Sequence, residues 1–222
     1  MTIEEANPRL LAERIIGMRE PGKRVIIGIA GPPGTGKSTL ATAILRLLPP
    51  SVVAVSVPMD GFHLSNQVLD ELGLSQVKGA PSTFDAGGYV SLLRRLKARN
   101  EDIVYAPSFD HRRGEPIAAS IAVPRNADVV LTEGNYLLAD QGVWRGCREN
   151  LDEVWFLDTP DDLRRSRLVK RHIDAGKEPE FARRWVLGPD EDNAKFVATT
   201  KSRADLRLLE LRDGWPVGVA SQ

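Results

Sequence analysis

A short segment near the start of the chain has glycine, lysine and serine at the spacing that binds phosphate. Residues 31–38 read GPPGTGKS and match the pattern G-x-x-x-x-G-K-[ST]. Glycines let backbone N–H groups turn toward phosphate oxygens, and the helix that follows such a loop points its positive end at the same anion. Lys37 can reach the outer phosphates, and the Ser38 hydroxyl can ligate Mg²⁺. The segment predicts a nucleoside triphosphate site formed by Gly31, Pro32, Pro33, Gly34, Thr35, Gly36, Lys37, Ser38 and Thr39.

This loop alone leaves kinases, GTPases, ATPase motors and transporter subunits open. A GTPase needs a guanine-reading segment N/T-K-x-D, but the nearest stretch, residues 200–203, reads TKSR and lacks the aspartate. An ATPase motor usually ends its third strand in Asp-Glu, whereas residues 131–134 read LTEG. Glu133 can still orient Mg²⁺ through water. Both observations favour a small-molecule kinase.

Two further groups of residues could act on a transferred phosphoryl group. Asp60 follows a buried strand, where carboxyl ends of parallel strands open onto a ligand crevice, so it can serve as a general base; a turn or helix N-cap role is the alternative. Arg164, Arg167 and Arg171 share one face of a helix expected over residues 160–175. They can neutralise phosphoryl charge, or they can form a solvated basic face. With Gly176 as a hinge, we expect a lid segment over residues 164–190 that excludes water.

The acceptor-side segment, residues 60–123, contains candidates for contact with a polyol. His111 and Arg112 lie between two prolines in residues 107–116, and Asp85 lies in the stretch PSTFD. Each side chain could bind a polyol, or could simply be polar and exposed.

The elements that must position these residues alternate between strands and helices. Continuous apolar runs predict buried strands at residues 24–30, 51–57, 129–132 and 154–157, with a last strand within 206–211. Helical patterns cover residues 8–18, 37–48, 65–72, 86–100, 160–175, 181–188 and 194–202, and residues 103–123 suit a hairpin. We therefore expect an α/β fold with three layers, a doubly wound and mostly parallel sheet, and a helical lid.

Length and charge limit the remaining choices. The 222 residues suit one domain, residues 1–222, and 30 basic side chains balance 30 acidic ones. Zero net charge argues against a dedicated nucleic-acid binder, and no apolar run is long enough for membrane insertion. One cysteine and an acidic start without an apolar signal core predict a cytoplasmic protein.

Several segments together resemble the superfamily of uridine kinase, phosphoribulokinase and bacterial pantothenate kinase. They are GPPGTGKST at 31–39, MDGF at 59–62, TFD at 83–85, PSFDH at 107–111, TEGNY at 132–136, and DT at 158–159 before the arginine helix. Residues 171–172, 192–194 and 200–205 resemble a nucleoside/nucleotide kinase-like subgroup associated with fructose transport. Leu168 and Phe109 depart from the uridine kinase pattern, and His63 with Leu64 departs from that of pantothenate kinase.

This resemblance implies a kinase fold, ATP and Mg²⁺ as cofactors, and roles by position. It makes Asp60 the catalytic base, with Lys37, Arg167 and Arg171 as further catalytic residues and Asn193 beside the adenine. Ser38 and Glu133 lie at Mg²⁺. The acceptor would contact Asp60, Phe62, His63, Asp85, His111, Arg112 and Glu133. Fructose is the first acceptor expected, with a nucleoside or pantothenate as alternatives. An alternative function from a different class is that of a nucleotide-binding regulatory or assembly protein with weak ATPase activity. The resemblance also raises a homodimer as an expectation.

Overall fold

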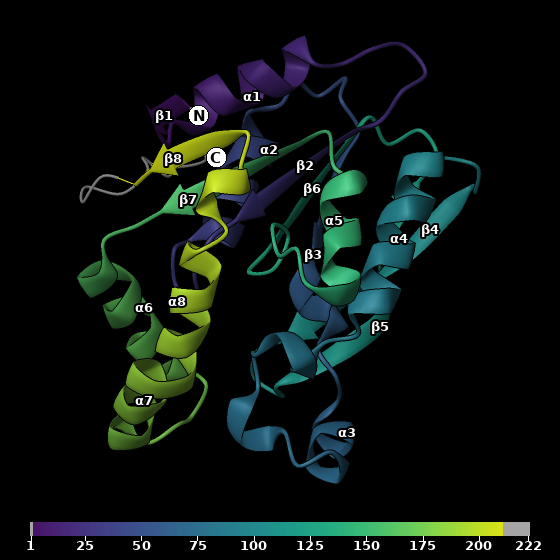
Figure 1. Cartoon of the computed structure of the whole chain (residues 1–222). Helices are drawn as coiled ribbons and strands as arrows, with labels where there is room; N and C mark the ends of the chain where they lie inside the picture. Colours follow the sequence, from purple (N-terminus) through teal and green to yellow (C-terminus); the bar gives the residue numbers. More distant parts are fainter. Residues whose placement is uncertain (1, 211–222) are drawn as a thin grey trace, which may run out of the picture.

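Six parallel strands form the central sheet of the computed structural model, which describes residues 2–210 (Figure 1). Their order is β1–β8–β7–β2–β6–β3. The strands are β1 (Thr2–Glu5), β2 (Val25–Ala30), β3 (Ala54–Pro58), β6 (Val129–Gly134), β7 (Glu153–Asp158) and β8 (Leu206–Leu209). The predicted parallel sheet is confirmed, and β2, which precedes the phosphate loop, lies between β6 and β7.

Helices cover both faces of the sheet, as the three-layer prediction requires. The α-helices are α1 (Pro8–Gly17), α2 (Lys37–Leu47), α3 (Asn66–Glu71), α4 (Ala86–Ala98), α5 (Arg145–Glu149), α6 (Asp161–Asp174), α7 (Pro179–Trp185) and α8 (Glu191–Ala198). Helices α1 and α2 bury apolar side chains such as Ile15 and Ile44 in one core. Helices α4, α5 and α8 contribute Leu93, Cys147 and Val197 to the other core. Because strands such as β2 are buried at every position, their sequence shows no alternation of polar and apolar residues.

The N-terminal residues form an edge strand that the sequence did not indicate. β1 pairs in parallel with β8, and the chain then enters α1 at Asn7, whose side chain accepts bonds from the N–H groups of Arg9 and Leu10. Four residues carry too little periodicity to be recognised alone, so pairing with β8 defines the strand. Part of the last predicted strand, residue 211, lies outside the described residues.

The acceptor-side segment contains the predicted hairpin. Strands β4 (Ile103–Asp110) and β5 (Glu115–Pro124) pair antiparallel, apart from the main sheet. α4 is anchored by a short chain of hydrogen bonds: the Tyr89 hydroxyl lies 2.6 Å from Thr132 Oγ1, which donates to the carbonyl of Val57. The hairpin, α3 and a 3₁₀ turn (Met59–Phe62) extend this side of the molecule beyond the carboxyl ends of the strands (Figure 1).

The lid segment is a hairpin of helices at the same end of the sheet. α6 and α7 pack together, and a π-helical turn (Val186–Asp190) connects α7 to α8. The helix predicted at 181–188 is therefore two elements, and the helix predicted at 194–202 begins at Glu191 and ends at Ala198. No helix within residues 2–210 is long and apolar enough to cross a bilayer.

Candidate active site

The carboxyl ends of three neighbouring strands bring the predicted chemistry together. β6 pairs with β2 on one side and with β3 on the other, and Glu133 aligns with Ile29 and with Pro58. The phosphate loop leaves β2, Glu133 lies near the end of β6, and Asp60 follows β3 by two residues. The prediction that these segments meet at one edge of the sheet is confirmed.

Close backbone packing explains the glycines of the phosphate loop. A Cβ at Gly31 would lie 2.6 Å from the carbonyl oxygen of Leu157, and one at Gly34 would lie 2.5 Å from that of Arg164. Gly36 has a φ of +83° and is the N-cap of α2, so backbone N–H groups at the helix start face the loop interior. The buried Thr35 hydroxyl donates to the carbonyl of Pro32 at 2.9 Å and stiffens the turn.

Lys37 lies inside this loop. Its Nζ donates to the carbonyls of Gly31 and Pro32 and to Asn135 Oδ1, each at 2.9 Å. Burial lowers the pKa of Lys37 to about 8, although Glu133 and Asp60 oppose the change. The three oxygens hold the ammonium at the position where phosphate oxygens would replace them.

Ser38 and Glu133 provide oxygen atoms suited to Mg²⁺. The Ser38 hydroxyl donates to Glu133 Oε1 at 2.9 Å. Burial, reinforced by the charge of Asp60, raises the pKa of Glu133 to about 7. A cation beside Glu133 would offset this cost. Mg²⁺ commonly takes one or two protein oxygens and fills its other positions with water and phosphate oxygens, so this pair fits the ion.

Asp60 is held by two close backbone approaches and keeps its carboxylate free. A Cβ at Gly61 would lie 2.4 Å from the carbonyl oxygen of Pro107, and one at Gly134 would lie 2.5 Å from the Met59 Cβ. These contacts seat the 3₁₀ turn against β4 and β6. Among residues 2–210 the Asp60 carboxylate has no hydrogen bond or ion pair, and it caps no helix. It is therefore available to a ligand.

His63 follows the 3₁₀ turn that contains Asp60, and its imidazole ring is neutral. Its Nδ1 lies 2.8 Å from the carbonyl oxygen of Asp60, and because a carbonyl only accepts, Nδ1 carries the proton. Burial lowers the pKa of His63, which keeps the ring uncharged. The ring centroid lies 4.0 Å from that of Phe84 and 4.6 Å from that of Phe109. Nε2 is consequently an acceptor on the wall of the cavity described next.

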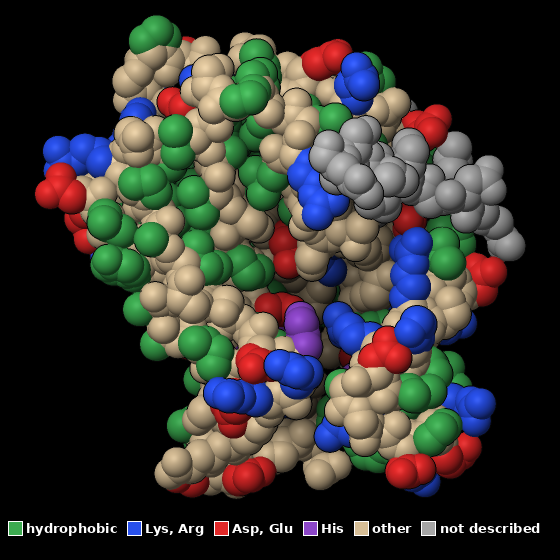
Figure 2. Space-filling view, turned by 180° about the vertical axis from the view of Figure 1, so that it is seen from behind, with side chains coloured by type: hydrophobic (Ala, Val, Ile, Leu, Met, Phe, Trp, Pro, Cys, Tyr) green, Lys and Arg blue, Asp and Glu red, His purple; other side chains and the backbone are tan. Residues whose placement is uncertain are grey.

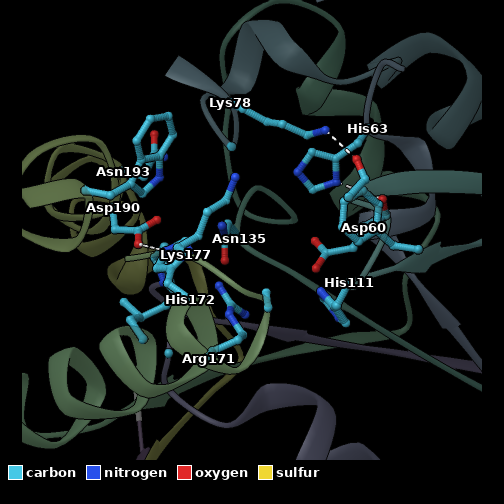
Figure 3. Close-up of a pocket in the computed structure, with 18 of the residues that line it drawn as sticks. Asp60, His63, Lys78, His111, Asn135, Arg171, His172, Lys177, Asp190 and Asn193 are labelled. Carbon is cyan, nitrogen blue, oxygen red and sulfur yellow. Dashed lines mark hydrogen bonds and ion pairs between the residues drawn. The ribbon is translucent and has the colours of Figure 1, made fainter. Parts of the chain in front are cut away.

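These groups border one cavity of about 710 Å³ between the phosphate loop, the acceptor-side segment and the lid segment. Its mouth is a hollow edged by charged and histidine side chains (Figure 2), and Figure 3 shows Asp60, His63 and His111 facing Arg171 and His172 across it. The predicted residues that line it are Pro33, Gly34, Gly36, Lys37, Ser38, Thr39, Asp60, His63, His111, Arg112, Glu133, Arg167, Arg171 and Asn193. Gly31, Pro32 and Thr35 lie behind the loop surface and shape it.

Two predicted acceptor contacts do not reach this cavity. Phe62 turns toward the core, where its ring centroid lies 5.2 Å from that of Tyr89. Asp85 is the N-cap of α4, and its carboxylate accepts from the Gly88 N–H at 2.8 Å. The orientations of Phe62 and Asp85 both follow from the packing of the start of α4 against the sheet. The expectation that Phe62 and Asp85 touch the acceptor is corrected accordingly.

The three arginines of α6 take different positions despite their shared face. Arg164 is 2% exposed and donates to Asp161 Oδ1 and to Glu191 Oε2, so it joins α6 to α8 and does not face phosphate. Arg167 makes a two-pronged ion pair with Glu210 at 2.7 and 2.8 Å. Arg171 borders the cavity without a carboxylate partner among the described residues. Of the three, Arg171 is the arginine free to bind a phosphoryl group.

Gly176, which was expected to act as a hinge, forms the turn that ends α6. With a φ of +86°, it ends α6 in a turn in which its N–H bonds the carbonyl of Ile173 and the Lys177 N–H bonds that of His172. The turn fixes where Lys177 leaves the helix.

Several cavity residues were absent from the sequence prediction. Asn135 binds Lys37, and the stretch TEGNY contained it without indicating its role. Lys78 donates to Asn66 Oδ1 and to the carbonyl of Gly114 at 2.6 Å. His172 Nε2 lies 2.9 Å from Asp190 Oδ2. Nothing local in the sequence marks these residues, because segments far apart along the chain bring them together.

Asn193 lines the cavity from α8, and its expected place beside the adenine stays a prediction. A Cβ at Gly79 of the acceptor-side segment would lie 3.4 Å from Asn193 Nδ2, so Asn193 faces that segment across the cavity.

Comparisons with known proteins agree with this geometry. The sequence profile of the phosphoribulokinase/uridine kinase family matches residues 26–213. A protein of Schizosaccharomyces pombe, provisionally named uridine kinase C227.14, is 34% identical over 212 residues, covering 91% of this chain and 90% of the relative. The pantothenate kinase of Hamiltonella defensa is 33% identical over 129 residues, covering 57% of this chain and 40% of the relative.

A solved structure is similar over nearly the whole chain. The Silicibacter sp. TM1040 protein, provisionally named a fructose transport system kinase, superposes with a TM-score of 0.79 at 35% identity, covering 90% of this chain and 98% of that one. YFH7 of Saccharomyces cerevisiae has the same fold, with a TM-score of 0.72 at 20% identity and coverage of 91% and 95%. The chain belongs to the phosphoribulokinase/uridine kinase family and is a P-loop kinase, a phosphotransferase that acts on hydroxyl groups.

Proposed function

We propose that this chain transfers the γ-phosphoryl group of ATP to a hydroxyl of a small polar metabolite, with a sugar such as fructose as the first acceptor to test. The observation that carries the proposal is the unpartnered Asp60 carboxylate, which borders the same cavity as Lys37 and the Ser38–Glu133 pair. Fructose rests on the name of the Silicibacter protein. A nucleoside or pantothenate is the alternative, because relatives carry those names.

The chain's own residues suit phosphoryl transfer, which depends on positioning and electrostatics. The loop N–H groups and Lys37 bind the outer phosphates, and Arg171 approaches from the lid segment. Asp60 accepts the proton of the attacking hydroxyl, while the neutral His63 accepts a hydrogen bond that orients the acceptor. Mg²⁺, held at Ser38 and Glu133, would neutralise charge on the phosphates. Movement of the lid segment over the cavity would exclude water, which would otherwise hydrolyse ATP.

Replacing Asp60 by asparagine tests the proposed base. Asparagine keeps the shape but cannot take the proton, so we expect Asp60→Asn to lower kcat by about 10²-fold or more with the KM for ATP unchanged. A coupled ADP-release assay across sugars, nucleosides and pantothenate measures this. Asp102→Asn is the matched control, since Asp102 is 93% exposed and outside the cavity. Near-normal turnover of Asp60→Asn would remove Asp60 as the base, and ADP release unmoved by every acceptor would favour a regulatory ATPase.

A further inference from the structure

The cavity contains positive side chains that the protein leaves without counter-ions. Lys78, Arg112, Arg171 and Lys177 all line it, and within residues 2–210 none of them forms an ion pair with a carboxylate. The other two outer cations differ: Arg113 lies 3.5 Å from Asp110, and Arg167 is bound by Glu210.

Lys78 and Lys177 come from opposite walls; hydrogen bonds hold Lys78, and Lys177 Nζ lies 5.7 Å from the Phe181 ring centroid. Lys78 leaves the acceptor-side segment, where Asn66 and Gly114 take two of its three donors and the Phe109 ring centroid lies 5.6 Å from Nζ. Lys177 follows the left-handed Gly176, whose turn directs the side chain toward the wall that Lys78 borders (Figure 3). One donor of Lys78 and all three of Lys177 stay open to a ligand.

The charges of Lys78 and Lys177 repel each other across the cavity. Burial lowers the pKa of Lys78, and the charge of Lys177 lowers it further, against the opposing charges of Glu115 and Asp70. Glu115 itself accepts from the Asn66 N–H at 3.0 Å, and Asp190, the lid-segment acid that lines the cavity, lies 2.9 Å from His172 Nε2. An anion between Lys78 and Lys177 would turn repulsion into attraction.

The nucleotide already has its own cations. The phosphate loop, Lys37 and the free Arg171 lie at the end of the cavity with Asp60 and Glu133, whereas Lys78 and Arg112 belong to the acceptor-side segment. The cavity therefore has a reacting end with carboxylates, and it has two further cations, Lys78 on its acceptor-side wall and Lys177 on its lid wall. A neutral acceptor would leave these two cations uncompensated.

We infer that the acceptor is an anion, a polyol with a phosphate monoester or a carboxylate that Lys78 and Lys177 bind while one of its hydroxyls faces Asp60. This inference rests on the proposed kinase function and narrows its acceptor class. Arg112, exposed on the hairpin tip and bordering the surface shared with Arg167 and Arg171, adds attraction from the rim.

Pairs of acceptors that differ in charge, one neutral and one anionic, test the inference that the acceptor is an anion. At saturating Mg-ATP, D-fructose is compared with D-fructose 1-phosphate and 6-phosphate, D-sorbitol with D-gluconate, and uridine with uridine 3′-phosphate. We expect the anionic member of at least one pair to exceed its neutral partner about tenfold or more in kcat/KM, a difference of about 1.4 kcal/mol. The gluconate arm separates a carboxylate from a phosphate. Equal or better use of the neutral member in every pair overturns the inference and leaves the kinase function intact.

The variant Lys177→Gln tests the residue assignment. Lys177 is exposed, so its loss should leave the fold intact while shrinking the preference for the anionic acceptor about fivefold or more. Lys195→Gln is the control, because Lys195 is also exposed, on neighbouring α8, pairs with Asp192 and lies outside the cavity. An unchanged preference in Lys177→Gln counts against the assignment.

A binding measurement separates this inference from failure of the proposed function. If no acceptor raises ADP release, the kinase proposal fails, and calorimetry then decides the anion site. Protein saturated with a non-hydrolysable ATP analogue is titrated with inorganic phosphate, which should bind wild type and Lys195→Gln alike and Lys177→Gln more weakly. Absence of phosphate binding to the wild-type complex would overturn the anion site as well.

Discussion

The ion pair between Arg164 and Glu191 makes a sharp test, because the structure predicts its strength from burial. Glu191 Oε2 accepts from Arg164 at 2.6 Å, and both its oxygens accept from Arg165 at 2.7 and 3.0 Å. The two arginines differ in exposure, 2% against 38%. Replacing the shared carboxylate by Glu191→Gln removes the buried negative partner of Arg164 and leaves it with Asp161, which is 64% exposed.

The magnitude follows from the pKa of Glu191. Hydrogen bonds from Arg165 and Arg164 lower it from 4.5 to about 2. Each pKa unit corresponds to about 1.4 kcal/mol, so the network is worth roughly 3 kcal/mol, or about 2–3 after allowing for the partial exposure of Arg165. For a chain of this size that predicts a melting temperature about 4–10 °C lower.

Thermal unfolding of the nucleotide-free protein at pH 7 measures this loss. Arg165→Gln is the matched control: it removes the exposed partner of the same carboxylate and should cost under about 1 kcal/mol. Because the pKa of Glu191 is depressed on folding, the stabilisation is complete well above pH 4.5 and declines as the pH falls toward 2. Equal, small shifts for Glu191→Gln and Arg165→Gln would refute the reasoning from burial.

Loss of the ion pair between Arg164 and Glu191 should also weaken the binding of ATP. The Arg164 carbonyl packs against Gly34 of the phosphate loop. We therefore expect Glu191→Gln to raise the KM for ATP more than Arg165→Gln does.

Two further variants probe the reacting end of the cavity. Glu133 keeps its proton up to about pH 7 in the folded state but only to about 4.5 when unfolded, so its cost to stability grows as the pH rises between these values. Glu133→Gln should thus melt about 3–8 °C above wild type at pH 8.5 in EDTA and little above it at pH 5; the same difference at both pH values would contradict the buried charge. Gly61→Ala places a Cβ against the Pro107 carbonyl, and we expect kcat and melting temperature to fall together. Gly17→Ala, with open space around its Cβ, should leave kcat unchanged and melt at the same temperature or slightly higher.

The sequence by itself determined the phosphate loop and the strands that frame it. The loop is contiguous, and its action depends on backbone conformation and near neighbours, so GPPGTGKS contains nearly all of the information. Uniformly apolar runs such as VIIGIA in β2 likewise indicate strands buried on both faces. Asp60 and Glu133 could be assigned to one edge because carboxyl ends of parallel strands converge there.

Only the tertiary structure decided which charged side chains reach the cavity. The i, i+3, i+7 spacing of Arg164, Arg167 and Arg171 gives a shared face, but the packing of α6 against α8 turns Arg164 inward to Glu191. Asp85 and Phe62 face away from the cavity for the same kind of reason. Lys78 and Lys177 line the same cavity from separate segments, and Lys37 binds Asn135 although 98 residues separate the two along the chain. The role of a charged side chain depends on its partners and on its burial. Contacts between segments that are distant in the sequence determine both the partners and the burial.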